Sequence, residues 1–184
     1  MQQICLRTAA SGTDATTLFF NSSIPAELFA FPYLSYDASL CLVACLDNIP
    51  HGYILGTADS EKFIEWMEHK WLPRLRSIFP ADTVSCSPVE RSFLNLIHTP
   101  APSWFNSPPC PAHLHIDLLP AVQRQRVGSK LVNQFIKLLQ QQNISQVYVD
   151  VSPRNRGAKQ FYTALGFTTL PATNPSSVMI KNFS

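Results

Sequence analysis

The stretch from Ala112 to Phe167 constrains the fold more than any other part of the chain. Residues 112–120 read AHLHIDLLP and alternate, with apolar side chains on one face and His113, His115 and Asp117 on the other, as a strand requires. Apolar residues then recur at three- and four-residue spacings from about Gln125 to Gln142, which predicts an amphipathic helix. A second apolar run and a short helical pattern follow. This order of elements predicts an α/β fold.

The turn between that strand and that helix has the properties of an anion site. Residues 123–129 read QRQRVGS, and the free N–H groups and positive dipole end of a helix start favour a phosphate. Six of the fourteen Lys and Arg residues gather at this turn and at the loop before the second helix: Arg124, Arg126, Lys130, Arg154, Arg156 and Lys159. Such a focused cluster indicates a small anionic ligand, whereas a net charge of +2 gives no general argument for nucleic acid.

Composition limits the class of protein. With 184 residues, 46% of them apolar and 14% charged, the chain is expected to form one domain spanning residues 1–184. The five cysteines are odd in number and lack C-x-x-C pairing, which predicts reduced thiols and no metal site. No signal-like start or membrane-length apolar run is present, so we expect an intracellular protein of the cytoplasm, the nucleus or both, with no membrane contact.

Other segments give weaker secondary-structure signals. The patterns predict strands at 4–8, 40–46, 52–57 and 177–183, and helices at 14–21, 23–28 and 60–75. Residues 78–111 contain seven of the fifteen prolines and cannot form one regular element, so we expect an ordered excursion there.

Two segments carry a family resemblance. QRQRVG at 123–128 resembles the acyl-CoA-binding turn of the GNAT acyltransferase superfamily, Gln/Arg-x-x-Gly-x-Gly/Ala, with Arg126 in place of the middle glycine. NRGAKQFYTALGF at 155–167 resembles the family's Asn-x-x-Ala-x-x-Phe-Tyr-x-x-x-Gly-Phe ending. The resemblance implies a mixed, splayed central sheet with helices on both faces, and acetyl-CoA as co-substrate for an amine acceptor.

The resemblance also assigns roles to individual residues. Backbone N–H groups near Leu118 and Leu119 would polarise the thioester carbonyl, and Tyr162 matches the tyrosine that protonates the leaving thiolate. Asn155 matches the residue that hydrogen-bonds the pantetheine arm. The cofactor phosphates would lie on the turn formed by Gln123, Arg124, Gln125, Arg126, Val127, Gly128, Ser129 and Lys130. The alternatives are ordinary ones: Tyr162 as a core aromatic, Asn155 as a helix start, and the basic side chains as solvated surface.

The polar row of the key strand has three interpretations. The histidines are satisfied by partners within the fold, or they bind a metal with Cys110 as the nearest sulfur, or they are catalytic. Amine acetylation needs a base, and histidine has a suitable ordinary pKa. His113-Leu-His115 also resembles the arylalkylamine acetyltransferase branch, which implies a proton path through both histidines. Asp117 would orient a histidine or attract a cationic acceptor.

A wider resemblance complicates the function. PAHLHIDLLPAVQRQRVGSKLV, with FAFPYL, GYILGTAD and WLPRLR, resembles the acetyltransferase-like domain of O-GlcNAc hydrolases and its free-standing relatives. Some members of that branch lack features needed for acetyl-CoA binding or transfer. In this sequence Gln123, Gly128, Asn155 and Tyr162 are all present, which favours cofactor binding. We expect N-acetylation of a small amine or a peptide lysine by direct attack in a ternary complex. The alternative is an inactive pseudo-acetyltransferase that binds CoA or protein, and both a monomer and a homodimer remain open.

Overall fold

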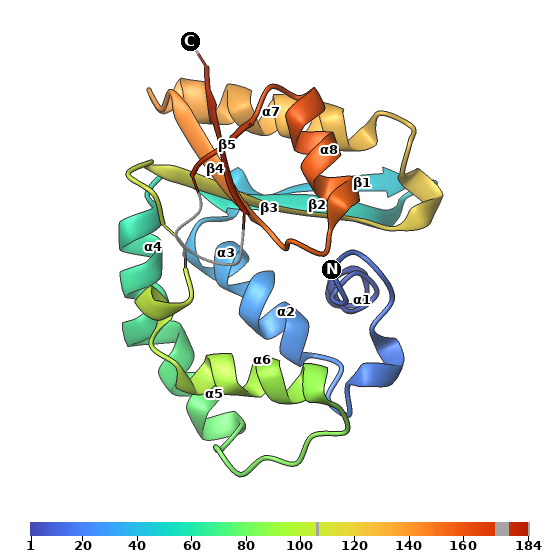
Figure 1. Ribbon diagram of the computed structural model, residues 1–184, viewed down its shortest axis with the longest axis vertical. Helices are drawn as coiled ribbons and strands as arrows, with labels where there is room; N and C mark the ends of the chain where they lie inside the picture. Colours follow the sequence, from blue (N-terminus) through green and yellow to red (C-terminus); the bar gives the residue numbers. More distant parts are fainter. Residues whose placement is uncertain (106, 172–176, 184) are drawn as a thin grey trace.

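A six-stranded mixed sheet divides the computed structural model, which describes residues 1–105, 107–171 and 177–183 (Figure 1). The spatial order is β1-β2-β3-β4-β6-β5. The strands are β1 (Leu42–Leu46), β2 (Ile49–Thr57), β3 (Ala112–Leu118), β4 (Gln146–Val151), β5 (Thr168–Thr169) and β6 (Ser177–Asn182). β3 and β4 pair in parallel, while the other neighbouring strands pair antiparallel. The predicted mixed sheet is confirmed.

Helices cover both faces of this sheet (Figure 1). The helices are α1 (Gln2–Leu6), α2 (Ile24–Phe29), α3 (Phe31–Tyr36), α4 (Ser60–Trp66), α5 (Leu72–Ile78), α6 (Pro88–His98), α7 (Val127–Gln141) and α8 (Arg156–Ala164). One buried apolar cluster joins α1–α6 to the sheet, and a second joins α7 and α8 to its other face. The alternation of β3 explains this division, because Leu114 lies in the α7–α8 cluster while His113 faces the helices of the first.

The parallel strands β3 and β4 separate soon after they begin. Their register contains two pairs, Ala112 with Val147 and His113 with Tyr148, although both strands continue beyond them. The rest of β3 pairs with β2 instead, up to Leu118 opposite Gly52. The sheet is therefore splayed at its centre, as the family resemblance implied, and the carboxyl half of β3 has one edge free of β4.

The first segment of the chain is helical, so the prediction of a strand at 4–8 is wrong. Ile4, Cys5 and Leu6 are all buried in succession, which a half-buried strand cannot achieve but a short helix wedged between α2 and β3 can. The Thr8 hydroxyl donates to the Ile4 and Cys5 carbonyls and terminates α1. The predicted helix at 14–21 is also reduced to a 3-10 turn, Thr16–Leu18, beside Asp14.

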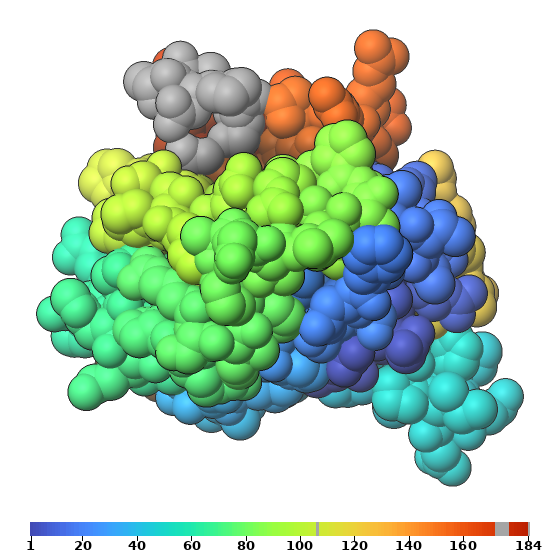
Figure 2. Space-filling view, turned by 90° about the horizontal axis from the view of Figure 1, so that it is seen from below, coloured from blue at the N-terminus to red at the C-terminus, as the bar shows by residue number. Residues whose placement is uncertain are grey.

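Prolines shape the long helical segment and the excursion after it. The helix from Ser60 continues to Ile78 through a π-helical turn, Met67–Trp71, because Pro73 has no N–H to continue the regular ladder. Within the proline-rich excursion lies α6, which the apolar pattern did not predict. Ser87 caps it by accepting from the Glu90 N–H. The outer face of this helical layer appears in Figure 2, where the β1–β2 turn protrudes at one edge.

Candidate active site

His113 is buried in a neutral hydrogen-bond network. Its Nε2 lies 2.8 Å from the Tyr33 hydroxyl and its Nδ1 lies 2.8 Å from the Ser60 hydroxyl. The side chain is 4% exposed, so burial, with a contribution from the charge of His115, lowers the pKa of His113 to about 3. Both ring nitrogens are occupied, which fits the interpretation of a satisfied core histidine.

His115, two residues along the same face, forms an ion pair. Its Nε2 lies 3.1 Å from Asp117 Oδ2, and its side chain is 33% exposed. Burial opposes the imidazolium, but the charge and hydrogen bond of Asp117 outweigh it and raise the pKa of His115 to about 10. Burial likewise disfavours the Asp117 carboxylate, yet the imidazolium and the hydroxyl of Tyr53 hold its pKa below the ordinary value. This pair is charged at neutral pH.

Two residues that sequence reasoning missed complete this cluster. Tyr53 on β2 stands opposite Asp117 in the strand register and donates its hydroxyl to Oδ2 of that carboxylate. The Cys5 thiol of α1 is among the groups that, after Asp117, raise the pKa values of His115 and of the Tyr53 hydroxyl. Neither residue carries a motif, and only the pairing of β2 with β3 and the packing of α1 bring them together.

Tyr162 on α8 is buried in the α7–α8 cluster, within range of the Asp117 charge. Its side chain is buried, and burial followed by the nearby charge of Asp117 raises its pKa above the ordinary value. The phenol is consequently neutral at any physiological pH and carries a proton to donate. Of the predicted catalytic set, the structure pairs His115 with Asp117, Tyr162 lies within range of the Asp117 charge, and His113 lies in its own network.

The end of β3 presents backbone groups toward the gap between β3 and β4. The Leu119 N–H donates to the His51 carbonyl at 2.8 Å, so it bonds to the β2 side. Leu118 and Gly52 are the next pair of this antiparallel ladder, so the N–H and C=O of Leu118 point away from β2. The Leu118 carbonyl accepts from Gln123 Nε2 at 2.7 Å. Of the two predicted polarising groups, Leu118 therefore has its N–H directed into the gap.

The predicted phosphate turn has an unusual backbone. Arg124 and Arg126 both adopt left-handed conformations, with φ of 60° and 62°. Arg126 thereby takes a backbone region that favours glycine, at the position where the family motif has one. The Lys130 N–H donates to the Arg126 carbonyl as α7 begins, and the N–H groups of Val127, Gly128 and Ser129 precede that first bond. The turn therefore forms despite the substitution.

Gly128 is required by packing within the protein. A Cβ atom at this position would lie 3.0 Å from the Phe161 ring and 3.2 Å from Leu118 Cδ1. The glycine lets the start of α7 pack against α8 and the end of β3. Any side chain here would disturb the fold as well as a ligand, so Ser129, which is half-buried, is the better position for a test.

Asn155 begins α8 beside a shallow pocket. Its Oδ1 accepts from the Ala158 N–H, as an N-cap does, and its Nδ2 faces Gly12 of the loop after α1. A pocket of about 330 Å³ lies next to it and carries the cationic side chains of Arg156 and Lys159. The arginine, lysine and amide groups suit an anionic or amide-rich ligand. Among the described residues, no group of three or more His, Cys, Asp or Glu side chains is placed to hold a metal ion.

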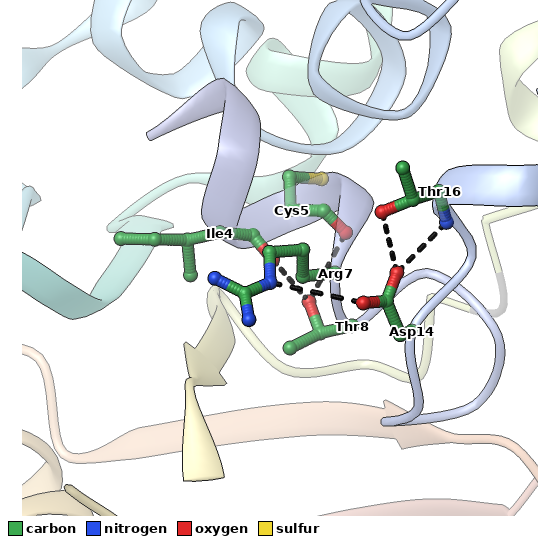
Figure 3. Close-up of polar contacts among 6 residues, drawn as sticks. All are labelled: Ile4, Cys5, Arg7, Thr8, Asp14 and Thr16. Carbon is green, nitrogen blue, oxygen red and sulfur yellow. Dashed lines mark hydrogen bonds and ion pairs between the residues drawn. The ribbon is translucent and has the colours of Figure 1, made fainter. Parts of the chain in front are cut away.

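The N-terminal segment lies across this site. The loop after α1 reaches Asn155 through Gly12, and the Ser11 hydroxyl lies 3.4 Å from that of Ser152. Figure 3 shows how the segment is held: Asp14 accepts from the N–H and hydroxyl of Thr16 and forms an ion pair with Arg7 at 3.7 Å. This segment therefore contacts both sides of the gap, at β3 through α1 and near α8 through its loop.

Comparison with known proteins agrees with this geometry. Residues 14–167 match the model of the acetyltransferase (GNAT) family. The chain belongs to that family. The crystal structure of a protein named SsHAT is similar over 100% of this chain and 92% of its own, with a TM-score of 0.88 and 30% sequence identity. Two further structures share the fold at lower identity.

These two structures come from an archaeon and a fungus. PH1933 from Pyrococcus horikoshii OT3 has 13% identity and a TM-score of 0.60, with coverage of 100% of this chain and 89% of that one. Naa20 from Chaetomium thermophilum, solved with a bisubstrate analogue, has 17% identity and a TM-score of 0.50, with coverage of 83% and 70%. As a GNAT protein, the chain has the architecture of an acyltransferase, and acetyl transfer is the general chemistry of its family.

Proposed function

We propose that this GNAT protein transfers an acetyl group from acetyl-CoA to a primary amine, on a small molecule or a peptide lysine, by direct attack in a ternary complex. The observation that carries the proposal is the splayed junction of β3 and β4, which has an anion-binding turn at the end of β3 and the His115–Asp117 pair beside it. We further propose that residues 1–184 form one acetyltransferase domain. Its five cysteines are all unpaired, which fits the reducing interior of a cell.

The cofactor would bind along the gap. The N–H groups at the start of α7 would hold the pyrophosphate, and Arg124, Arg126 and Lys130, all exposed at this turn, would neutralise it. Asn155 would hydrogen-bond the pantetheine arm. The Leu118 N–H would donate to the thioester oxygen, where negative charge develops as the amine attacks.

His115 would accept the proton of the attacking amine. An alkylammonium group has an ordinary pKa of about 10. A base whose own pKa is about 10 can take its proton at almost no cost in free energy, although only its neutral fraction is active at pH 7. Asp117 orients the ring, and Tyr162 would protonate the leaving CoA thiolate. His113 would position β3 through Tyr33 and Ser60 without reaching the substrate.

Binding and turnover are tested separately. Ser129→Glu places a carboxylate in the first turn of α7, where it favours the helix but repels a phosphate, and Ser129→Gln is the matched neutral control. We expect acetyl-CoA binding by calorimetry in the wild type and the Gln variant and about tenfold or greater weakening in the Glu variant. Release of CoA thiol in the presence of amines then measures turnover. Equal affinity in all three proteins would place the cofactor elsewhere.

The pH dependence of turnover tests the base. We expect kcat/KM to rise with pH until about pH 10. The His115→Gln variant should lose the part of this rise that comes from deprotonation of the His115 ring. The rise that remains in the variant belongs to the amine itself. Identical profiles in the two proteins would remove His115 from the mechanism.

A pseudo-acetyltransferase is the second candidate. The observation that favours it is the N-terminal segment, which covers the His115–Asp117 pair with α1 and faces Asn155 with Gly12. The wider resemblance to the acetyltransferase-like domain of O-GlcNAc hydrolases points the same way. Acetyl-CoA binding without thiol release from any amine would support this function as a CoA- or protein-binding module. Trp104 and Phe105 of the excursion pack against the α1–α6 cluster.

A further inference from the structure

Tyr148 on β4 carries a polar group that has no partner within the fold. Its side chain is 3% exposed, yet its hydroxyl neither donates nor accepts a hydrogen bond. Among the residues that the structure describes, no other buried side-chain nitrogen or oxygen atom is in this state. A buried hydroxyl without a partner costs free energy, so stability does not explain its presence, whereas a ligand that supplies the partner does.

Tyr148 lies at the point where β3 and β4 separate. Its Cα atom is opposite that of His113 in the last pair of these two strands, and the centroids of the two rings are 5.4 Å apart. Beyond this pair the strands diverge, and β3 changes from buried to half-buried at His115. The Tyr148 side chain is therefore on the face that carries the polar row of β3, at the inner end of the accessible part of that row.

The surroundings of this hydroxyl favour a neutral ligand group. The pKa of His113 is lowered to about 3, mainly by burial, so its ring is uncharged at neutral pH. Burial raises the pKa of the Tyr148 phenol, the nearby Ser107 and Ser60 hydroxyls oppose this, and the charge of Asp150 contributes least. Ser107 is exposed, so the phenol is close to the protein surface. A protonated phenol in such a site can donate to a carbonyl oxygen without the cost of burying an unpaired charge.

The separation of Tyr148 from His115 limits the length of the acceptor. One strand spacing of about 4.8 Å and two residues of about 3.3 Å each place the two Cα atoms roughly 8 Å apart. Both side chains project from the same face of the sheet, because His115 is two residues from His113. A peptide lysine carries its amine on a four-carbon stem from the main chain, so its amine and its main-chain carbonyl have a comparable separation.

We propose that Tyr148 recognises the acceptor by donating a hydrogen bond to the main-chain carbonyl of a peptide lysine whose amine reaches His115. The inference rests on the proposed N-acetyltransferase function and narrows its acceptor to a lysine within a peptide. Tyr148 takes no part in the transfer of the acetyl group, so it determines specificity only. A simple alkylamine of equal length leaves the hydroxyl without a partner and is bound less well for that reason.

The kinetic test compares two amines on the full chain. Nα-acetyl-lysine methylamide has the main-chain carbonyls, and n-pentylamine has the same alkylamine without them. Release of CoA thiol at saturating acetyl-CoA gives kcat and KM for each. We expect the wild type to favour the lysine derivative about tenfold in kcat/KM, and Tyr148→Phe to lose this preference through a higher KM at unchanged kcat. Tyr36→Phe, which alters a half-buried tyrosine beside Trp66, is the matched control and should keep the preference.

Stability separates this role from a structural one. The Tyr148 hydroxyl has no partner, so Tyr148→Phe should melt at the temperature of the wild type or above it. Tyr33→Phe loses a hydrogen bond to His113 and should melt at a lower temperature. A melting temperature of Tyr148→Phe that falls as far as that of Tyr33→Phe would show that the hydroxyl is bonded within the protein, and would overturn the inference.

The kinetic outcomes distinguish this inference from the proposed function. Equal kcat/KM values for the two amines in the wild type, a preference that persists in Tyr148→Phe, or turnover of other amines alone removes the role of Tyr148 and leaves the proposed function standing. Absence of acetyl-CoA binding by calorimetry, or of thiol release with any amine, removes the inference together with the proposed function.

Discussion

His113 and His115 lie on one face of one strand, yet the protein gives them opposite electrostatic properties. His113 meets two hydroxyl groups and no charge within hydrogen-bonding distance, so burial, with a smaller contribution from the charge of His115, lowers its pKa to about 3. His115 is equally part of the strand but meets a carboxylate, which raises its pKa to about 10. The difference comes from the partner that each ring faces. The spacing of the two histidines in the sequence does not reveal this difference.

We assign a structural role to His113 and propose a chemical role for His115. A neutral histidine with both nitrogens occupied fixes the position of β3 against α3 and α4, since Tyr33 and Ser60 belong to those helices. A charged histidine at the edge of the gap can exchange its proton. Environments that move two pKa values apart are typical of catalytic sites, which is why we propose His115 as the group that transfers the proton.

The largest expected effect comes from removing the Asp117 carboxylate, which makes the pKa of His115 differ from that of His113. In Asp117→Asn, burial acts on His115 with only the smaller contribution of Cys5 against it, so the pKa of His115 should fall well below its value of about 10. Turnover should decrease about a hundredfold because the ring loses both orientation and basicity. NMR titration of the imidazole signals measures the pKa, and Asp117→Glu keeps the charge as a control. A ring that still titrates near pH 10 would show that another group holds the proton.

Replacement of His113 should reduce the free energy of unfolding more than replacement of His115, although His115 matters more for turnover. His113→Ala leaves the Tyr33 and Ser60 hydroxyls without their shared partner and opens a cavity, so the free energy of unfolding should fall by about 3 kcal/mol. His115→Ala, at a site with 33% exposure, should cost clearly less. Urea denaturation of both variants, with His113→Gln as a polar control, measures the difference. Equal losses would mean that the two rings have the same structural importance.

The pH dependence of stability should have a maximum near pH 6.5. The pKa of His113 is lowered on folding, so its contribution is present above about pH 6.5 and is lost as the pH falls toward 3. The pKa of His115 is raised on folding, so its contribution is present below about pH 6.5 and is lost as the pH rises toward 10. On the acid limb of this curve, below the maximum, and on the alkaline limb, above it, the free energy of unfolding changes by at most about 1.4 kcal/mol per pH unit for each histidine.

Two variants assign the limbs of this curve. In denaturation measured across the pH range, His113→Gln should flatten the acid limb and His115→Gln the alkaline limb. The acid limb retains a smaller contribution from Asp117, whose pKa is lowered on folding. A single variant that flattens both limbs would contradict the separation of the two sites.

The smallest expected effect tests one bond of the neutral network. Tyr33→Phe keeps the ring that stacks on Phe63 with centroids 4.5 Å apart and removes only the hydroxyl bonded to His113. The free energy of unfolding should fall by about 1 kcal/mol. Thermal or urea denaturation measures this, and Tyr36→Phe, an aromatic pair partner of the same Phe63, is the control that should have little effect. A loss as large as that of His113→Ala would mean that Tyr33 supports more than this bond.

The sequence predicted the central part of the fold because each of its elements has its own period. The alternation in 112–118 fixed which face of β3 carries the polar row, and the stripe in α7 fixed the face that packs on the sheet. The predicted strands at 40–46, 52–57 and 177–183 and the helix at 23–28 are confirmed as β1, β2, β6 and α2.

What failed depends on tertiary contacts. Residues 4–8 contain β-branched and apolar side chains and look like a strand, but burial against α2 and β3 makes them α1. In α6, Ser87 and Glu90 formed a readable capping pattern that the surrounding prolines obscured. The partners of the two histidines were beyond prediction, because Tyr33, Tyr53 and Ser60 reach β3 from segments far away in the sequence.

The separation of β3 from β4 has a consequence for how ligand binding would affect stability. Open edges usually lie at the two sides of a sheet, but here Leu118 belongs to an open edge in the middle of the sheet, on the side of β4. A ligand whose amide groups hydrogen-bonded to that edge would extend the sheet as an added strand does. Because only the folded protein has this edge, such a ligand would stabilise the folded state. If acyl-CoA binds there as proposed, occupancy and fold stability are thermodynamically linked, and the melting temperature should rise with the concentration of acyl-CoA.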